Sequence, residues 1–305
     1  MNPPQILFRG SCAALITPFT EEGFPDESAL RRLIRAQIES GAGAILLCGT
    51  TGEGSALSSA ERKRILAIAR EERAAHGSAL PLIVGAGTSS TKSTCAQAEA
   101  AARAGADALL VLTPPYVKAT EDGLAGHLAA VSDAAALPIL LYHVPGRTGM
   151  RLTLSHLDKI ADQCPSVIGI KEASGDIGLF SRIREHFGDR FALYCGSDEI
   201  NLPALCLGAD GLISVLAVAC PALTASLCRL AGQGRLNDAR RLHFASMPLV
   251  RSLFSQVNPV VIKGLMARLG LCEGAIRLPL TQAKQSLLEE AESNLRKAEE
   301  ALREL

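Results

Sequence analysis

Residues 167–175 read VIGIKEASG, an apolar run that ends in a lysine, a glutamate and a glycine-containing turn. The run is apolar throughout instead of alternating, which is typical of a strand in a parallel sheet that is covered on both faces. Similar runs recur along the whole chain. Together with this one, they begin near Cys12, Ala44, Leu82, Ala108, Ile139, Val167, Phe191 and Gly211.

The segments between these runs have the apolar spacing of helices. Asp26 is placed to cap one helix, and Ser58 and Glu61 have the spacing of a capping box at the start of another. Gly105 and Gly208 follow helical patterns and can supply the left-handed residue that ends a helix. The chain therefore alternates strands with helices from start to finish.

Eight strand-then-helix units in 305 residues favour an α/β fold of the (β/α)8 (TIM) barrel type over an open sheet. A doubly wound sheet would usually show G-x-G-x-x-G after its first strand, and the nearest match, at residues 85–87, lacks the third glycine. We expect the barrel to span residues 1–235 and a C-terminal helical extension to span residues 236–305. Because no linker separates them, we expect one structural unit, ending in an amphipathic helix within residues 282–305.

Composition excludes several classes of protein. The formal charge is zero, the pI is near 7.0 and there is no Trp, so the chain lacks the basic surface of a nucleic-acid binder. No run of about 18 apolar residues predicts a membrane span. The first residues do not show the basic and then apolar order of a secretory signal, so we expect a cytoplasmic protein.

The nine cysteines do not form a recognisable framework. Their number is odd, their spacing is irregular and no C-x-x-C occurs, so we interpret them as small apolar core residues rather than disulfides or zinc ligands. H-E-x-x-H is also absent and the six histidines are scattered, so we expect no tightly bound transition metal.

Lys171 is the first candidate catalytic residue, because barrel active sites lie at the C-terminal ends of the strands and this lysine ends an apolar strand. Burial disfavours an ammonium group, and a neutral amine is what attack on a ketone carbonyl requires. The alternative is a lysine that reaches solvent or pairs with a carboxylate. Its position alone does not decide between them.

Other polar residues also follow strands. In Gly49-Thr50-Thr51-Gly52-Glu53, two glycines flank two hydroxyls, so backbone N–H and hydroxyl groups could converge on a small carboxylate. The same segment could be only a tight turn, and the spacing of a nucleotide-binding P-loop is absent.

Tyr116 and Tyr142 each follow or end a strand, and a phenol can both donate and accept a proton. Arg147, in a loop shaped by Pro and Gly, could hold a carboxylate through two hydrogen bonds. Core rings and a surface ion pair are equally open interpretations. Asp198 and Glu199 could cap the next helix or line the mouth of a pocket.

Five motifs appear in order at barrel spacing: GTTGE (49–53), TPPY (113–116), LYHVPGRTG (141–149), IGIKEASG (168–175) and GLISV (211–215). With them, nearly the whole chain resembles the dihydrodipicolinate synthase and N-acetylneuraminate lyase superfamily. The resemblance implies a metal-free and cofactor-free lyase in which Lys171 forms an imine with pyruvate. It implies a proton relay of Thr50, Tyr142 and Tyr116, with Tyr116 reaching into a neighbouring subunit. It further implies that Thr51 holds the pyruvate carboxylate, that backbone groups of Gly196 and Ile213 complete the pocket, and that the protein is at least a dimer and usually a tetramer.

Within this superfamily the chain is most similar to the synthases. Arg147 matches the residue that grips aspartate semialdehyde, and residues 258–263 and 277–280 resemble synthase tails. The implied reaction condenses pyruvate with L-aspartate 4-semialdehyde to 4-hydroxy-tetrahydrodipicolinate, towards lysine and diaminopimelate. The alternatives are a lyase that cleaves a sugar acid, such as N-acetylneuraminate or 2-keto-3-deoxygluconate, and a non-catalytic barrel that binds a carboxylate.

The chain departs from the synthase pattern at several positions. His143 and Val218 stand where Asn is usual, Pro115 replaces a common Tyr, and the G-S-D-E at 196–199 is closer to that of sugar-acid lyases. The positions that bind inhibitory lysine in regulated members are here Ser59, Arg62, Ser89 and Ser93. We therefore expect weak lysine feedback, or none.

Overall fold

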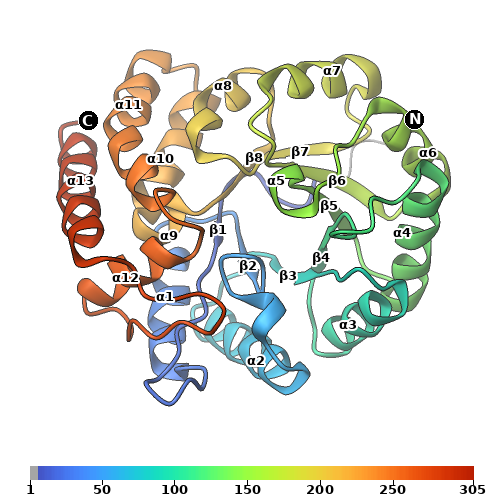
Figure 1. Cartoon of the computed structure of the whole chain (residues 1–305). Helices are drawn as coiled ribbons and strands as arrows, with labels where there is room; N and C mark the ends of the chain where they lie inside the picture. The colour runs from blue at the N-terminus through green and yellow to red at the C-terminus, as the bar shows by residue number, and fades with distance from the viewer. Residues whose placement is uncertain (1–5) are drawn as a thin grey trace.

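The computed structural model describes residues 6–305, in which eight parallel strands pair in chain order and close between β8 and β1 (Figure 1). The strands are β1 (Gly10–Ala14), β2 (Ala44–Leu47), β3 (Leu82–Ala86), β4 (Ala108–Leu112), β5 (Ile139–His143), β6 (Val167–Glu172), β7 (Ala192–Cys195) and β8 (Gly211–Ser214). Each begins at, or within two residues of, its predicted start. The prediction of a (β/α)8 barrel is confirmed.

Helices surround the barrel, and two of them begin at the caps that the sequence predicts. Asp26 accepts a hydrogen bond from the Ala29 amide at 3.0 Å, and Ser58 and Glu61 form the expected capping box. Gly105 and Gly208 take positive φ angles of 88° and 85°. The outer helices are α1 (Glu27–Glu39), α2 (Ser59–Ala75), α3 (Thr91–Arg103), α4 (Glu121–Ala135), α6 (Leu154–Gln163), α7 (Ile177–Phe187), α8 (Asn201–Cys206) and α10 (Pro221–Gly232). Short helices follow four strands: η1 (Gly54–Ala56), α5 (Pro145–Thr148), η2 (Asp198–Ile200) and α9 (Leu216–Ala219).

The C-terminal extension consists of α11 (Leu236–Leu253), α12 (Val260–Arg268) and α13 (Gln285–Arg303), which lie together at one side of the barrel (Figure 1). The predicted amphipathic terminal helix is confirmed, because Leu288, Ala291, Leu295 and Ala298 are buried at helical spacing. These side chains belong to the same continuous core as the outward-facing residues of the strands. The extension therefore shares the core of the barrel.

Side chains of the strands alternate between two cores. The outward set packs under the helices, and the inward set fills the barrel, where Phe8 and Tyr194 stack with their ring centroids 4.3 Å apart. Since Phe8 precedes β1, this stack closes the N-terminal end of the barrel. The opposite end, where the strands finish, is left for the site.

The register between β5 and β6 shifts by one residue near the start of the pair. Ile139 lies beside Val167, but Leu140 lies beside Gly169, so Ile168 is an extra residue. The strands then run in register, with Tyr142 beside Lys171. Because Tyr142 belongs to the inner core, its neighbour Lys171 also faces the barrel interior. If Ile168 were paired with Leu140 instead, regular alternation would place Lys171 beside His143 and turn it outward.

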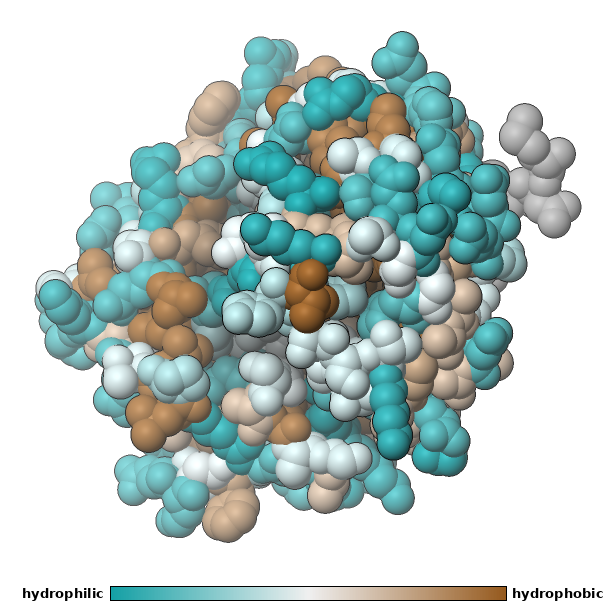
Figure 2. Space-filling model, turned by 45° about the vertical axis from the view of Figure 1, so that its right-hand side comes forward, coloured by the Kyte–Doolittle hydropathy of each residue, from teal (hydrophilic) through white to brown (hydrophobic). Residues whose placement is uncertain are grey.

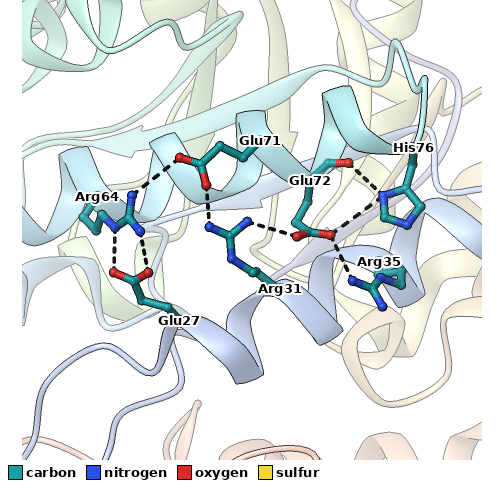
Figure 3. Close-up of polar contacts among 7 residues, drawn as sticks. All are labelled: Glu27, Arg31, Arg35, Arg64, Glu71, Glu72 and His76. Atoms are coloured by element: carbon teal, nitrogen blue, oxygen red, sulfur yellow. Dashed lines mark hydrogen bonds and ion pairs between the residues drawn. The ribbon is translucent and has the colours of Figure 1, made fainter.

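The surface of the molecule is largely polar, and Figure 2 shows apolar side chains as separate groups between hydrophilic ones. Ion pairs join neighbouring outer helices, as between α1 and α2, where Arg31 contacts both Glu71 and Glu72 (Figure 3). Within residues 6–305, no helix combines the length and the apolar character needed to cross a membrane.

All nine cysteines are free. Five are buried, as expected of small apolar residues, but Cys206 is exposed, so the interpretation as core residues is wrong for that position.

Candidate active site

Lys171 lies at the C-terminal end of β6 and is only 5% exposed. Its Nζ atom is 4.3 Å from the centroid of the Tyr142 ring on β5. Within residues 6–305, two buried pairs join a basic or imidazole side chain to a carboxylate, the His143–Glu172 hydrogen bond and the Lys263–Glu53 ion pair, and Lys171 belongs to neither. The alternative of a lysine paired with a carboxylate is therefore not what the structure contains.

Gly196, just after β7, makes room for the lysine side chain. A Cβ atom at this position would lie 2.7 Å from Lys171 Cε and 2.9 Å from Ala173 Cβ, which is closer than unbonded carbons approach. The Gly196 amide is fixed because it donates to the Glu172 carbonyl at 2.7 Å. The glycine therefore sets where the Lys171 chain can lie.

A pocket of about 550 Å³ opens at this end of the barrel. Thr50, Tyr142 and Arg147 all line it, so three predicted site residues from different segments meet there. Lys171, Gly196 and Ile213 do not line this pocket, but Ile213 packs in the same inner core as Tyr142. Tyr142 is thus the side chain that joins the pocket to the buried lysine.

Thr51 is buried and lies next to a segment from the far end of the chain. The Asn258 side-chain amide donates to Thr51 Oγ1 at 3.0 Å, and Arg147 donates to the Asn258 carbonyl at 2.9 Å. Because the Thr51 oxygen accepts here, its own hydroxyl hydrogen stays available for an anion. Asn258 therefore links Thr51, which is predicted to hold the carboxylate of pyruvate, to Arg147, which is predicted to hold the carboxylate of the semialdehyde.

The loop of residues 49–53, the threonine loop, is held at its end by an ion pair. Glu53, with a positive φ of 51°, contacts the fully buried Lys263 and also accepts from the Arg277 amide at 3.0 Å. Lys263 Nζ lies 3.8 Å from the centroid of the Phe19 ring. Burial lowers the pKa of Lys263, and the bond to Glu53 opposes that shift. Glu53 therefore holds two separate parts of the C-terminal extension.

Arg277 adds a further clamp through its side chain. It donates to the carbonyls of Ala56 at 2.6 Å and Gly23 at 2.7 Å and pairs with Glu61. The Arg277 bond lowers the pKa of Glu61 to about 2.

Tyr116 does not join this group. Tyr116 is 92% exposed. Its backbone has a positive φ of 74°, and its amide donates to the Thr148 carbonyl at 3.1 Å. The expectation that it serves a neighbouring subunit stays a prediction.

Asp198 caps a helix, but not the one that follows it directly. Its carboxylate accepts from the Val215 amide at 3.0 Å and the Leu216 amide at 2.9 Å, at the start of α9, and from Asn201 and Ser214. It is buried and engaged on both oxygens, whereas Glu199 is exposed. Asp198 is therefore occupied by structure and does not line the pocket.

Two thiols near Lys171 are not candidate nucleophiles. Burial raises the pKa of Cys12 and of Cys195 to about 12 each, although the charge of Lys171 acts in the opposite direction. Both therefore stay protonated at neutral pH. Across residues 6–305, no group of three or more His, Cys, Asp or Glu side chains is placed to hold a metal ion.

Sequence reasoning gave no role to Asn258 or Lys263 and did not single out Glu172. Asn258 and its partner are 207 residues apart, and Lys263 and Glu53 are 210 residues apart, so no local pattern signals either contact. Only the tail motif that contains both residues pointed to this segment.

A closed parallel barrel with a buried lysine at the mouth, surrounded by hydroxyls and an arginine, defines the class of barrel lyases that act through an amine. The model of the Dihydrodipicolinate synthetase family matches residues 7–298. The chain belongs to this family.

Relatives support the assignment over nearly the whole length of the chain. The 4-hydroxy-tetrahydrodipicolinate synthase of Clostridium perfringens is 41% identical, over 95% of this chain and 98% of that protein. The structure of the synthase from Methylacidiphilum fumariolicum has a TM-score of 0.92 at 32% identity and covers 97% of both chains. The dihydrodipicolinate synthase from Acinetobacter baumannii, solved in complex with pyruvate, has a TM-score of 0.91 at 34% identity and covers 95% of this chain and 99% of that one.

We predict that Glu53→Gln destabilises the protein, because it leaves the Lys263 ammonium buried without a counter-charge. Removing one partner of such a pair costs about 3–5 kcal/mol, which urea unfolding would measure. Glu27→Gln is the matched control, since Glu27 pairs with Arg64 while both side chains are almost half exposed (Figure 3). That change should cost less than about 1 kcal/mol. Equal losses in the two variants would contradict the prediction.

Proposed function

We propose that this protein condenses pyruvate with L-aspartate 4-semialdehyde to 4-hydroxy-tetrahydrodipicolinate, and that Lys171 is the amine that forms the imine. The observation that carries the proposal is the position of Lys171, buried at the barrel mouth beside Tyr142 and outside the buried pairs His143–Glu172 and Lys263–Glu53. The family assignment and the pyruvate complex of the Acinetobacter baumannii relative support the same reaction.

In the proposed reaction, the Lys171 amine attacks the ketone carbon of pyruvate and water leaves as the imine forms. Loss of a methyl proton gives an enamine, whose carbon bonds to the aldehyde carbon of the second substrate. The amino group of that substrate then displaces Lys171 and closes the ring. The imine activates the ketone as a metal would in other lyases, so we propose that no metal or cofactor takes part.

Proton transfer in these steps is assigned to Thr50, Tyr142 and Tyr116, and the pyruvate carboxylate to the free hydroxyl hydrogen of Thr51. Backbone groups of Gly196 and Ile213 are proposed to complete the pocket. Thr50 and Tyr142 line the pocket within one chain, but Tyr116 is exposed. The relay is complete only if a second copy supplies its Tyr116, so we propose at least a dimer, assembled further into a tetramer.

Arg147 is assigned to the carboxylate of the semialdehyde, because it is exposed at the pocket and its guanidinium is held by the Asn258 carbonyl. Cleavage of a sugar acid is the weaker alternative. Its support in the sequence was the G-S-D-E segment, and Asp198 of that segment is engaged in capping α9.

We predict that Gly196→Ala slows imine formation by about 100-fold, because a displacement of the Lys171 amine by about 1 Å has effects of that size. Borohydride trapping with pyruvate, followed by peptide mass mapping, measures the adduct. The wild-type adduct should lie on the peptide that contains Lys171, and its absence there would disprove the proposed function. Gly232→Ala is the control, since nothing lies within 4 Å of that new Cβ. Equal trapping in both variants would refute the role of Gly196.

Arg147→Ala should leave imine formation with pyruvate intact and lower kcat/KM for the semialdehyde. The loss should be about 10- to 100-fold, the value of a hydrogen bond to a charged group. Arg151→Ala is the control, because Arg151 is exposed nearby and lies outside the pocket. Equal losses in trapping and in turnover would contradict the role given to Arg147.

Lysine should inhibit weakly or not at all. Arg62, at one of the positions that bind lysine in regulated members, already donates to the backbone carbonyls of Gly54 and Gly85. Turnover measured with added lysine tests this, and strong inhibition by submillimolar lysine would overturn the prediction.

A further inference from the structure

We propose that His143 and Glu172 are a pair of positioning residues that fix Lys171 and Tyr142 in place for imine formation. The inference rests on the proposed function, and it adds two residues to which that function assigns no role. Both are buried, with His143 1% and Glu172 0% exposed.

The pair lies directly behind the two inward-facing residues. In the register of β5 and β6, Tyr142 lies beside Lys171, and His143 lies beside Glu172. Successive side chains of a strand point to opposite faces, so His143 and Glu172 project from the outer side of the barrel wall. Their hydrogen bond therefore joins β5 to β6 one residue away from the reacting groups.

The hydrogen bonds of the pair fix one protonation pattern. His143 Nε2 accepts from the Leu152 amide at 3.1 Å, so the ring hydrogen sits on Nδ1 and is donated to Glu172 Oε2. The other carboxylate oxygen accepts from the Ser174 amide at 2.6 Å. Every polar atom of the two side chains has a partner, which is the condition under which a buried polar network is rigid.

These bonds extend from the strands to two loops. Leu152 lies in the segment that follows α5, the helix that carries Arg147, and Ser174 lies in the turn after β6. One histidine ring thus connects the end of β5, the end of β6 and the segment behind Arg147. Loss of either contact frees a different part of the site, so the two can be tested separately.

Three variants separate the contacts. His143→Leu removes both bonds and leaves the Glu172 carboxylate short of a donor. His143→Asn places an amide N–H near the position of Nδ1 and restores the bond to Glu172, but it is too short to reach Leu152. Glu172→Gln keeps the shape of the side chain but offers one acceptor oxygen to two donors, so its amide N–H faces either the Nδ1 hydrogen of His143 or the Ser174 amide.

We expect imine trapping with pyruvate to fall by about 100-fold in His143→Leu and in Glu172→Gln, as for displacements of about 1 Å. His143→Asn should recover most of the trapping rate but keep a raised KM for the semialdehyde. His186→Leu is the matched control, since that histidine also bonds a carboxylate, Asp158 at 2.8 Å, on the surface. It should match the wild type in both measurements.

Wild-type trapping rates in His143→Leu and Glu172→Gln, in folded protein, would overturn the proposal. If His143→Leu does not fold, Glu172→Gln and His143→Asn decide, and wild-type trapping together with a wild-type KM in both would refute the pair. A purely structural role predicts lowered melting temperatures with no recovery of trapping by Asn. If the wild type itself traps no adduct, the proposed function fails, and the pair fails with it as a positioning device.

Discussion

A parallel strand presents successive side chains to opposite faces. In β6 this alternation is interrupted at Ile168, which has no partner on β5. From that point on, Lys171 faces inward and Glu172 faces outward. Gly169 is required at the same place, because a Cβ there would lie 2.8 Å from the Ala192 carbonyl oxygen. The side of the wall on which the amine lies, and the side on which the His143–Glu172 pair lies, both follow from this one extra residue.

Much of the fold could be predicted from the sequence, because the strands are continuous apolar runs and the helices carry local capping signals. Asp26, Ser58 and Glu61 cap helices through partners only a few residues away, so the sequence itself shows their roles. Asn258 and Lys263 act across more than two hundred residues, and only the closed barrel brings them to the threonine loop. The sequence left two roles open for Asp198, a helix cap or a pocket residue, because most of its partners come from the next strand unit.

The site combines groups that are costly to bury with partners that compensate them. Lys263 pairs with Glu53, and His143 is hydrogen-bonded to Glu172, so these two buried pairs are each held in one geometry. Lys171 is different, because it lies outside both of these pairs. An amine that is already buried and not bound by a carboxylate loses no ion pair when it becomes part of an imine.

The contacts of the threonine loop with Asn258, Lys263 and Arg277 join an early part of the chain to its last fifth. All eight strands precede these three residues in the sequence, since the last strand ends at Ser214. The strands therefore carry Lys171 but supply none of these three anchors of the loop. The geometry of the loop beside the amine thus depends on a segment that contributes no strand to the barrel.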